Sequence, residues 1–231
     1  MCYNEERTIR EVVENLYNVL SKISEDFEII IVDDGSTDNS KNIIKNLLSD
    51  KVKAIFHSQN LGIGEVLRSG YFNANYEYVF IVPADGQFDL NELYLIKEIP
   101  EKSFISFYRE DLKDYSIFRK LLTFYNNFII NKLILGIKTK DVNWVKIFPT
   151  SVIKTLDLKL RSSLIQTEIC AKLEKIGYKP VEIPSKYLQR KDVKSKVNFK
   201  IIIKAFFESF KLIYEVKKFN IRLVGKIKKN R

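Results

Sequence analysis

Short apolar runs alternate with longer amphipathic stretches over the first hundred residues. The runs at residues 27–32 (FEIIIV), 52–57 and 78–82 (YVFIV) are rich in β-branched and aromatic residues, which is typical of buried strands. Apolar residues recur at helical spacing in the neighbouring residues 5–21, 38–48, 62–74 and 90–99. The pattern therefore predicts strands and helices in alternation.

The second half continues this pattern less regularly. Further strands are expected at residues 103–106, 141–148 and 178–183, and helices at residues 116–135 and 163–176. Gly177 is a good C-cap for the last of these helices. From residue 184 the chain becomes basic and polar, and then forms an apolar-basic helix. We expect a main domain over residues 1–190, followed by a basic loop and an amphipathic C-terminal helix over residues 191–231.

Strands that alternate with helices at this spacing predict an α/β fold, with a mostly parallel sheet and helices on both faces. Ligands bind such sheets beyond the carboxyl ends of the strands. A sheet of this kind usually opens with a strand before the first helix. Met1 stands where that strand would end, so either the fold lacks the first strand or the sequence lacks its first several residues, and we favour a truncated start.

Composition narrows the class of protein. The 231 residues carry a formal net charge of +10, and 45% of them are hydrophobic, which is enough for one sizeable core. The positive surplus favours anionic partners such as phosphorylated substrates, acidic lipid or nucleic acid. Cys2 and Cys170 lie far apart and imply neither a disulfide framework nor a metal site. No apolar run reaches the roughly 18–20 residues of a membrane-spanning helix.

Two acidic clusters follow predicted strands, at residues 33–38 and 85–89. A carboxylate in the first can bind a nucleobase N–H or a ribose hydroxyl. Oxygen ligands in the second suit Mg²⁺ or Mn²⁺ bridging two phosphates. Each cluster taken alone is equally explained as a turn before a helix, with Asp38 or Asp89 as the helix cap.

Four motifs together carry a resemblance to a known family. They are residues 2–6 (CYNEE), 32–40 (VDDGSTDNS), 60–64 (NLGIG) and 84–89 (ADGQFD). In order and spacing they resemble glycosyltransferase family 2, and most closely its dolichyl-phosphate mannosyltransferase and polyprenyl-phosphate glycosyltransferase branch. The resemblance implies a GT-A fold. It also implies inverting transfer of a hexose from a nucleoside-diphosphate sugar of the GDP-mannose or UDP-glucose type.

The resemblance also implies roles for single residues. Tyr3 and Glu5 would line the nucleotide pocket, and Asp34 would bind the base or the ribose. Asp85 matches the last acid of the family's Asp-x-Asp metal motif, and Gln87 follows two residues later. We expect Asp85 and Gln87 to bind the donor through Mg²⁺ or Mn²⁺, with Asp85 as a catalytic residue.

This sequence departs from the family pattern at Pro83, where many relatives have an aspartate. One metal ligand is therefore missing. Because Mg²⁺ often keeps several waters, the remaining ligands and the substrate phosphates still form a reasonable site. The departure leaves open an altered or weak activity.

Two further acids are catalytic candidates by resemblance. Asp141, in the segment DVNWVK with Lys146, would orient the site, and Glu168 would act near the acceptor. The alternative for Asp141 is a turn at the edge of a strand. The alternative for Glu168 is a favourable charge at a helix N-terminus.

Basic residues supply candidates for binding phosphate. By resemblance, Arg190 and Lys196 would close over the donor diphosphate, since arginine binds phosphate oxygens in a bidentate manner. Arg119 and Lys120 would meet the acceptor phosphate. A solvated linker and a solvated helix start are the alternatives. His57, the only histidine, has no partner at catalytic spacing, and we interpret it as structural or as a surface residue.

Residues 118–135 and 198–231 combine apolar faces with lysine and arginine, which is typical of interfacial helices. A polyprenyl phosphate acceptor would place the enzyme at the cytoplasmic face of the membrane as a peripheral protein. A core-packed helix and a basic tail form the alternative.

The expected reaction is attack of a polyprenyl phosphate on the anomeric carbon of the donor. One rival is a family member that extends a polysaccharide or glycolipid at a hydroxyl group. Rivals of another class are a basic nucleic-acid-binding module and a catalytically silent scaffold. Nucleic acid is not the expected partner, because neither a motif of stacking aromatics nor a recognition helix can be identified.

Overall fold

The computed structural model describes residues 1–110, 125–188 and 199–219. Its strands form two sheets. In the first, β1 (Ile29–Asp33) and β2 (Val52–Phe56) run parallel. The second has the order β3-β5-β4-β6, formed by β3 (Tyr78–Phe80), β5 (Lys146–Pro149), β4 (Ser103–Arg109) and β6 (Lys179–Ser185). Strands β4 and β6 are parallel, whereas β5 is antiparallel to both of its neighbours.

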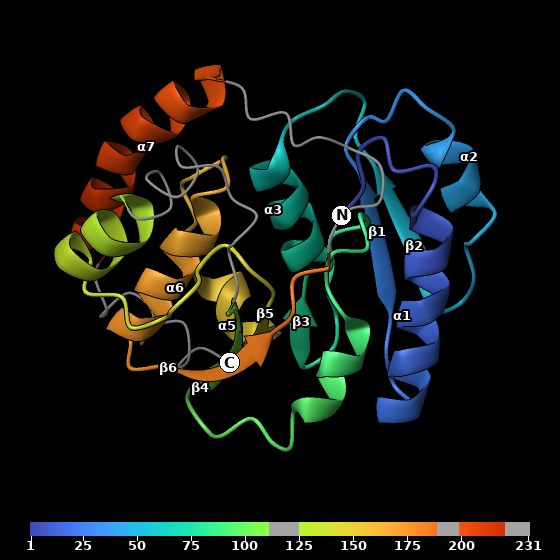
Figure 1. Ribbon diagram of the computed structural model, residues 1–231, viewed down its shortest axis with the longest axis horizontal. Helices are drawn as coiled ribbons and strands as arrows, with labels where there is room; N and C mark the ends of the chain where they lie inside the picture. The colour runs from blue at the N-terminus through green and yellow to red at the C-terminus, as the bar shows by residue number, and fades with distance from the viewer. Residues whose placement is uncertain (111–124, 189–198, 220–231) are drawn as a thin grey trace.

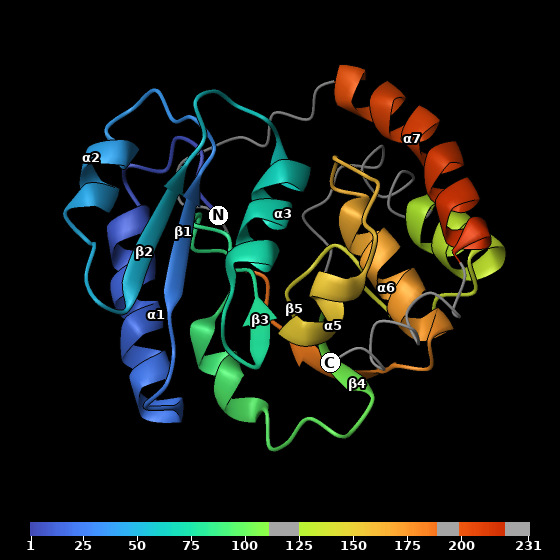
Figure 2. The same cartoon turned by 180° about the vertical axis from the view of Figure 1, so that it is seen from behind.

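The first residues of the chain lie between the two sheets (Figures 1 and 2). Cys2 forms a parallel bridge with Asp33 of β1. On the other side, the Met1 amine donates to the Val82 carbonyl at 2.9 Å, and the Ala84 N–H donates to the Met1 carbonyl at 2.9 Å. Residues 1–2 therefore link the sheets at one end, as the last part of a strand would.

Helices cover both faces, as the sequence predicted. On one face, α1 (Ile9–Ile23) packs with α2 (Ser40–Lys45) and the 3₁₀-helix Leu90–Leu95 over a core that includes Ile44 and Ile105. A second core, on the other face, lies among α3 (Ile63–Asn73), α5 (Thr150–Thr155) and α6 (Ile165–Lys175). In α1 the buried Ile9, Val13, Leu16 and Val19 repeat at helical spacing, which explains its single buried face.

The C-terminal helix α7 (Phe199–Lys218) packs on α6. Leu212 is fully buried and Val216 nearly so, and the Lys175 ammonium donates to the Val216 carbonyl at 2.8 Å. The described part of α7 is therefore integrated with the core. The predicted boundary at residue 190 lies within residues that the structure does not describe and stays a prediction.

Three predicted elements differ from the structure. The helix expected at residues 90–99 is the short 3₁₀-helix Leu90–Leu95, which ends before Pro100. The strand expected at residues 141–148 begins only at Lys146, because the N–H groups of Asn143 and Trp144 bond to Asp141 in a turn. Within the helix expected at residues 116–135, the described part is the π-helix Tyr125–Ile134.

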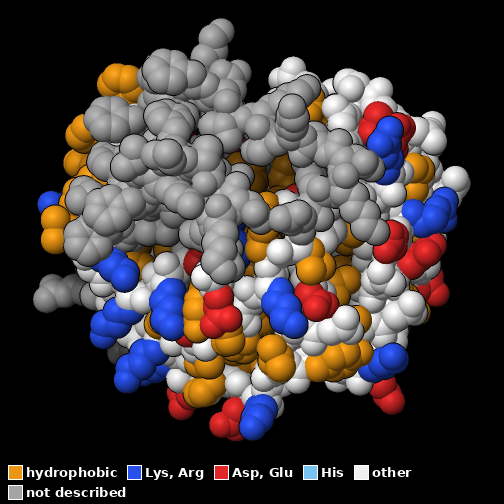
Figure 3. Space-filling model, in the orientation of Figure 1, with side chains coloured by type: hydrophobic (Ala, Val, Ile, Leu, Met, Phe, Trp, Pro, Cys, Tyr) orange, Lys and Arg blue, Asp and Glu red, His pale blue; other side chains and the backbone are white. Residues whose placement is uncertain are grey.

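Basic and acidic side chains both occur across the described part of the face shown in Figure 3. Positive charge is therefore not separated from negative charge on that part of the surface.

Gly64 packs α3 against the loop before α6. A Cβ at Gly64 would lie 1.9 Å from the Arg161 carbonyl oxygen, so backbone would have to move. We expect Gly64→Ala to lower the free energy of unfolding by about 1–3 kcal/mol. Gly70→Ala is the matched control in the same helix, because its Cβ would meet Ile81 at an ordinary 3.6 Å. Urea unfolding of both variants checks this, and equal losses would contradict it.

Candidate functional site

Reciprocal hydrogen bonds join residues 2–6 to the loop after β1. The Thr37 N–H donates to Asn4 Oδ1 at 2.8 Å, and the Asn4 N–H donates to Ser36 Oγ at 2.9 Å. The Asn39 N–H donates to Glu6 Oε2 at 2.9 Å, and the Glu6 N–H donates to an oxygen of Asp38 at 3.1 Å. The two segments therefore form one continuous edge of the site.

The loop after β3 joins the same edge. Thr8 Oγ1 donates to the Ala84 carbonyl at 2.6 Å, and the Ala84 N–H bonds to Met1. Residues 2–6, 32–40 and 84–89 thus meet at the carboxyl ends of β1 and β3. This is where an α/β sheet binds its ligands.

Tyr3 and Glu5 lie on this edge. The Tyr3 side chain is exposed, which leaves its ring accessible to a planar ligand. Glu5 is held by its N–H, which donates to Ser40 Oγ at 2.9 Å. Their roles in the nucleotide pocket stay predictions.

Asp34 is nearly fully buried, and its carboxylate bonds to the 60–62 loop. It accepts from the Leu61 N–H at 2.9 Å and the Gly62 N–H at 2.8 Å. His57 Nδ1 lies 2.7 Å from Asp34 Oδ1, and His57 Nε2 lies 2.9 Å from Ser69 Oγ. Asp34 thereby fixes the loop beside the edge, and its predicted contact with the base or ribose stays a prediction.

The sequence showed no partner for His57 at catalytic spacing, and the fold supplies Asp34 and Ser69 instead; the interpretation of His57 as a structural residue agrees with its burial. The His57 N–H donates to the Asp33 carbonyl at the end of the β1–β2 ladder. Because β1 and β2 are parallel and in register there, the residues that follow them lie side by side. The sequence contained this signal, as Asp34 and His57 each follow a strand by one residue.

Asp85 and Gln87 lie together in one tight turn. The Gln87 N–H donates to Asp85 Oδ1 at 3.1 Å, and Gln87 Nε2 donates to the Tyr187 hydroxyl at 2.6 Å. Because the amide nitrogen of Gln87 is used in this bond, its oxygen is left as the ligand atom. Asp89 accepts from the Asn91 N–H at 3.0 Å and caps the 3₁₀-helix, which confirms the alternative interpretation of that residue.

The donor set fits a hard divalent cation with few protein ligands. Within the described residues no group of three or more histidine, cysteine, aspartate or glutamate side chains is placed to hold a metal ion. The candidate ligands are one carboxylate, of Asp85, and one amide oxygen, of Gln87. Mg²⁺ commonly binds through one or two protein ligands, substrate phosphates and waters.

Arg109, at the carboxyl end of β4, was not predicted as part of the site. Its guanidinium makes a bidentate pair with Asp141, at 2.8 Å from Nε and 3.1 Å from Nη2. The same group lies 4.8 Å from the centre of the Trp144 ring and 6.0 Å from that of Tyr187, which itself contacts Gln87. Its position at the end of a strand was the signal available in the sequence.

Asp141 is buried beside this arginine. Burial raises the pKa of its carboxyl group, but the hydrogen bonds and charge of Arg109 and the charge of Lys146 together lower it by more, so the pKa lies below its usual value. The buried Lys146 ammonium donates to the backbone carbonyl of Asp141. The structure supports both the turn and a role in orienting Arg109, and the catalytic role stays a prediction.

The lowered pKa of Asp141 predicts an acid-labile contribution to stability. A carboxyl group whose pKa is lowered on folding stabilises the native state at pH values above its unfolded pKa of about 4. This contribution to stability is lost as the pH falls through the pKa of the native state. Asp141→Asn should therefore destabilise the protein at pH 7 and have a smaller effect near pH 3. Urea unfolding of both proteins at the two pH values checks this, and an equal difference at both would contradict it.

Glu168 is fully buried in α6, which contradicts its predicted action near the acceptor. Its carboxylate accepts from the N–H groups of Lys159 and Leu160, each at 2.9 Å, and from the Lys172 ammonium at 2.6 Å. A carboxylate enclosed by three donors has no access to a substrate. Glu168 instead joins α6 to the preceding loop.

Four predicted phosphate ligands lie outside the described residues, namely Arg119, Lys120, Arg190 and Lys196. The described chain before Arg190 runs beside the Asp85 turn, since the Leu188 N–H donates to the Gln87 carbonyl at 3.0 Å. No helix in the described ranges is long and apolar enough to cross a membrane.

Comparison with known proteins identifies the family. The family profile described as Glycosyl transferase family 2 matches residues 1–143. The chain belongs to glycosyl transferase family 2. The predicted family and its class of enzyme, the glycosyltransferases, are confirmed.

Two relatives show how far the similarity extends. An uncharacterised glycosyltransferase of Nostoc is 36% identical over 104 residues, which are 44% of this chain and 31% of that protein. The undecaprenyl-phosphate 4-deoxy-4-formamido-L-arabinose transferase of Edwardsiella ictaluri is 24% identical over 212 residues, covering 89% of this chain and 64% of that protein. This chain thus spans less than two thirds of each.

A solved structure supports the predicted fold. The glucosyl-3-phosphoglycerate synthase of Mycobacterium tuberculosis, in complex with Mn²⁺, UDP and glucosyl-3-phosphoglycerate, aligns with a TM-score of 0.59 at 13% identity. The alignment covers 97% of this chain and 77% of that structure. The GT-A fold expected from the sequence is confirmed.

Proposed function

We propose that this family 2 glycosyltransferase moves a hexose from a nucleoside-diphosphate sugar to a polyprenyl phosphate, with inversion at the anomeric carbon. The observation that carries the donor half of the proposal is the meeting of residues 2–6, 32–40 and 84–89 at one edge, joined by the Asn4–Thr37 and Thr8–Ala84 hydrogen bonds. The acceptor half rests on the Edwardsiella relative, whose name gives undecaprenyl phosphate and which aligns with most of this chain.

The donor would lie along this edge. Tyr3 offers an exposed ring for the base, and Glu5 would contact the base or the ribose. Asp34, whose carboxylate is buried and bonded to the 60–62 loop, would contribute by holding that loop beside the donor. The diphosphate would lie toward the turn of Asp85 and Gln87. The base would thus lie near the end of β1, and the diphosphate near the end of β3.

Asp85 and Gln87 would hold Mg²⁺ or Mn²⁺. The Mycobacterium enzyme, with the same fold, was crystallised with Mn²⁺ and UDP. When bound, such a cation neutralises the charge of the departing diphosphate. The Asp85–Gln87 turn and the Gln87–Tyr187 bond restrain both side chains, which supports this assignment.

The acceptor needs little activation by the protein. A phosphate monoester is already anionic near neutral pH, so its oxygen attacks the anomeric carbon without a strong general base. The Arg109 guanidinium lies 6.0 Å from the centre of the Tyr187 ring, which contacts Gln87, and Asp141 fixes the plane of this guanidinium. In this proposal the acceptor phosphate is bound by Arg119 and Lys120. The donor diphosphate is bound by Arg190 and Lys196. A lipid acceptor would bring the enzyme to the cytoplasmic face of the membrane as a peripheral protein.

A thermal-shift screen of UDP- and GDP-sugars, with and without Mn²⁺, tests the donor site. A ligand present at 100 times its dissociation constant stabilises the folded protein by about 2.7 kcal/mol. We expect one nucleotide class to raise the melting temperature, and Mn²⁺ to increase the shift. Absence of a shift with every nucleotide sugar would contradict the donor site.

A further inference from the structure

The turn that contains Gln87 is bound to the residues that follow β6, about a hundred positions later in the chain. Tyr187 forms an antiparallel bridge with Phe88, and the Leu188 N–H donates to the Gln87 carbonyl at 3.0 Å. The Tyr187 hydroxyl accepts from Gln87 Nε2 at 2.6 Å. Two neighbouring residues therefore hold Gln87, one at its side chain and the other at its backbone.

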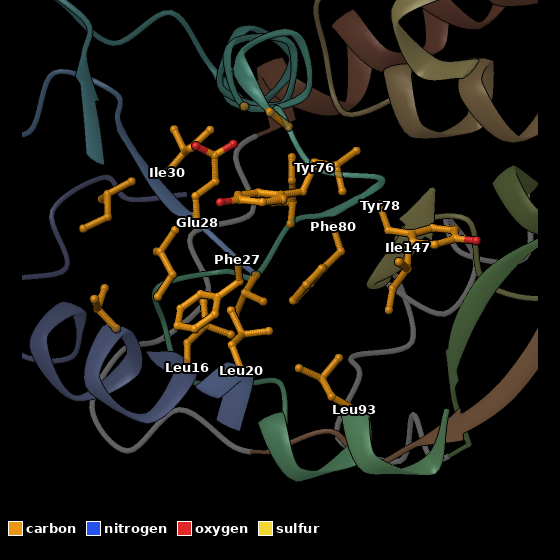
Figure 4. A pocket seen from close by; sticks show the side chains of 18 of the residues that line it. Leu16, Leu20, Phe27, Glu28, Ile30, Tyr76, Tyr78, Phe80, Leu93 and Ile147 are labelled. Carbon is orange, nitrogen blue, oxygen red and sulfur yellow. The ribbon is translucent and has the colours of Figure 1, made fainter. Parts of the chain in front are cut away.

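The end of β6 is itself fixed from two sides before it reaches this turn. Trp144 Nε1 donates to Ser185 Oγ at 2.7 Å, and both residues are buried. The Lys186 N–H donates to Glu92 Oε1 of the 3₁₀-helix at 2.6 Å. Figure 4 shows the next residue of that helix, Leu93, pointing into the apolar cavity between the two sheets, which anchors the helix.

The ring of Tyr187 is held by two further side chains. Its centre lies 5.7 Å from that of the Trp144 ring, and the Arg109 guanidinium lies 6.0 Å from it. Aromatic rings at such distances attract one another, and a guanidinium near a ring face does so as well. The hydroxyl is therefore presented to Gln87 by a group whose own position is fixed by the rest of the fold.

Gln87 is the candidate ligand that gains most from being held. Its amide oxygen carries no formal charge, and the long glutamine side chain loses much rotamer freedom when it is ordered. Pro83 supplies no carboxylate at the position where the family resemblance implies one. A ligand that is already ordered binds more tightly, because the cost of ordering it is not subtracted from the binding free energy.

The Tyr187 bond also changes the amide electronically. Donation of a hydrogen bond by the amide nitrogen polarises the whole amide group, since hydrogen bonds in a chain strengthen one another. The oxygen of Gln87 thereby carries more negative charge and becomes a better ligand for a hard cation.

We propose that Tyr187 is a positioning residue for the divalent cation, and that its hydroxyl holds the Gln87 amide with the oxygen available as a ligand. The inference rests on the proposed metal site of Asp85 and Gln87. Tyr187 acts through Gln87 and does not itself bind the cation. Groups that hold a metal ligand in this way typically account for a factor of about 10–100 in metal affinity.

Tyr187→Phe tests the proposal, because it removes the hydroxyl and keeps the ring and the backbone bonds. Mn²⁺ alone is titrated into the protein, and the free ion is measured by its electron paramagnetic resonance signal. We expect the dissociation constant for Mn²⁺ to rise about tenfold or more. Tyr94→Phe is the matched control, since Tyr94 is an exposed tyrosine of the neighbouring 3₁₀-helix, and it should leave the constant unchanged. Thermal unfolding without metal checks that both variants are folded.

Gln87→Ala, alone and combined with Tyr187→Phe, shows whether the effect passes through Gln87. Once Gln87 is removed, the hydroxyl has no ligand to hold, so the double variant should bind Mn²⁺ no more weakly than Gln87→Ala. In the transfer assay, Tyr187→Phe should need about tenfold more Mn²⁺ for half of its maximal rate. Its kcat at saturating Mn²⁺ should equal that of the wild type, because only the binding of the cation is weakened.

Equal Mn²⁺ affinity in Tyr187→Phe and the wild type would overturn the role of Tyr187 and leave the metal site intact. A loss in the double variant that is the sum of the two single losses would overturn it as well. Absence of Mn²⁺ binding to the wild-type protein would contradict the metal site itself, and this inference with it. The two kinds of failure are therefore distinguishable.

Discussion

Replacing Asp85 by asparagine should lower kcat/KM for sugar transfer by about two to three orders of magnitude, which corresponds to about 3–4 kcal/mol. The substitution keeps the oxygen that accepts from the Gln87 N–H, so the turn should persist. It removes the charge that would hold the divalent cation. Initial rates over a range of Mn²⁺ and donor concentrations measure the loss, and thermal unfolding of the variant checks that it is folded.

Asp89→Asn is the matched control in the same loop. The Asp89 carboxylate caps the 3₁₀-helix by accepting from the Asn91 N–H, and asparagine caps helices equally well. We expect its kcat/KM to stay within about threefold of the wild-type value, well under the factor of ten that corresponds to 1.4 kcal/mol. Similar losses in the two variants would mean that Asp85 has no particular role.

Replacing Glu168 by alanine should lower the free energy of unfolding by about 3–5 kcal/mol, because it leaves the buried Lys172 ammonium without its partner charge. The N–H groups of Lys159 and Leu160 would lose their acceptor as well. Urea unfolding measures the loss. Glu168→Gln should be less damaging, since its amide oxygen still accepts one of these bonds.

Asp157→Ala is the control for a nearby acid. Asp157 pairs with Lys159 at the surface, and exposed pairs of this kind contribute little to stability. Its unfolding curve should match that of the wild type. If Glu168→Ala unfolded like the wild type but had lost transfer activity, the structural role given to Glu168 would be wrong and the catalytic prediction would return.

The strands were predictable where burial is complete. The run FEIIIV is apolar because β1 is buried on both faces, whereas β2 is only partly buried and carries the exposed Lys53. The direction and start of β5 were not predictable, because they depend on the turn that the Asp141 side chain makes with Asn143. Local hydrogen bonds from a side chain to the backbone override the apolar pattern there.

The site was predictable in its segments but not in its contacts. The three segments could be placed together because each follows or precedes a strand end. The Asp34–His57 pair depends on the register of two strands, and the Arg109–Asp141 pair depends on β4 and the following turn meeting in space. For Glu168 the spacing of four residues to Lys172 was a visible signal of an ion pair within α6.

Transfer to a lipid phosphate tests the central claim most directly. The protein is incubated with a radiolabelled donor, either UDP-glucose or GDP-mannose, with Mn²⁺ and a polyprenyl phosphate in detergent, and the mixture is extracted with chloroform. The account predicts label in the chloroform phase that mild acid releases as free sugar, and none when the polyprenyl phosphate is replaced by a polyprenol. Label that appears only in a water-soluble product would contradict it.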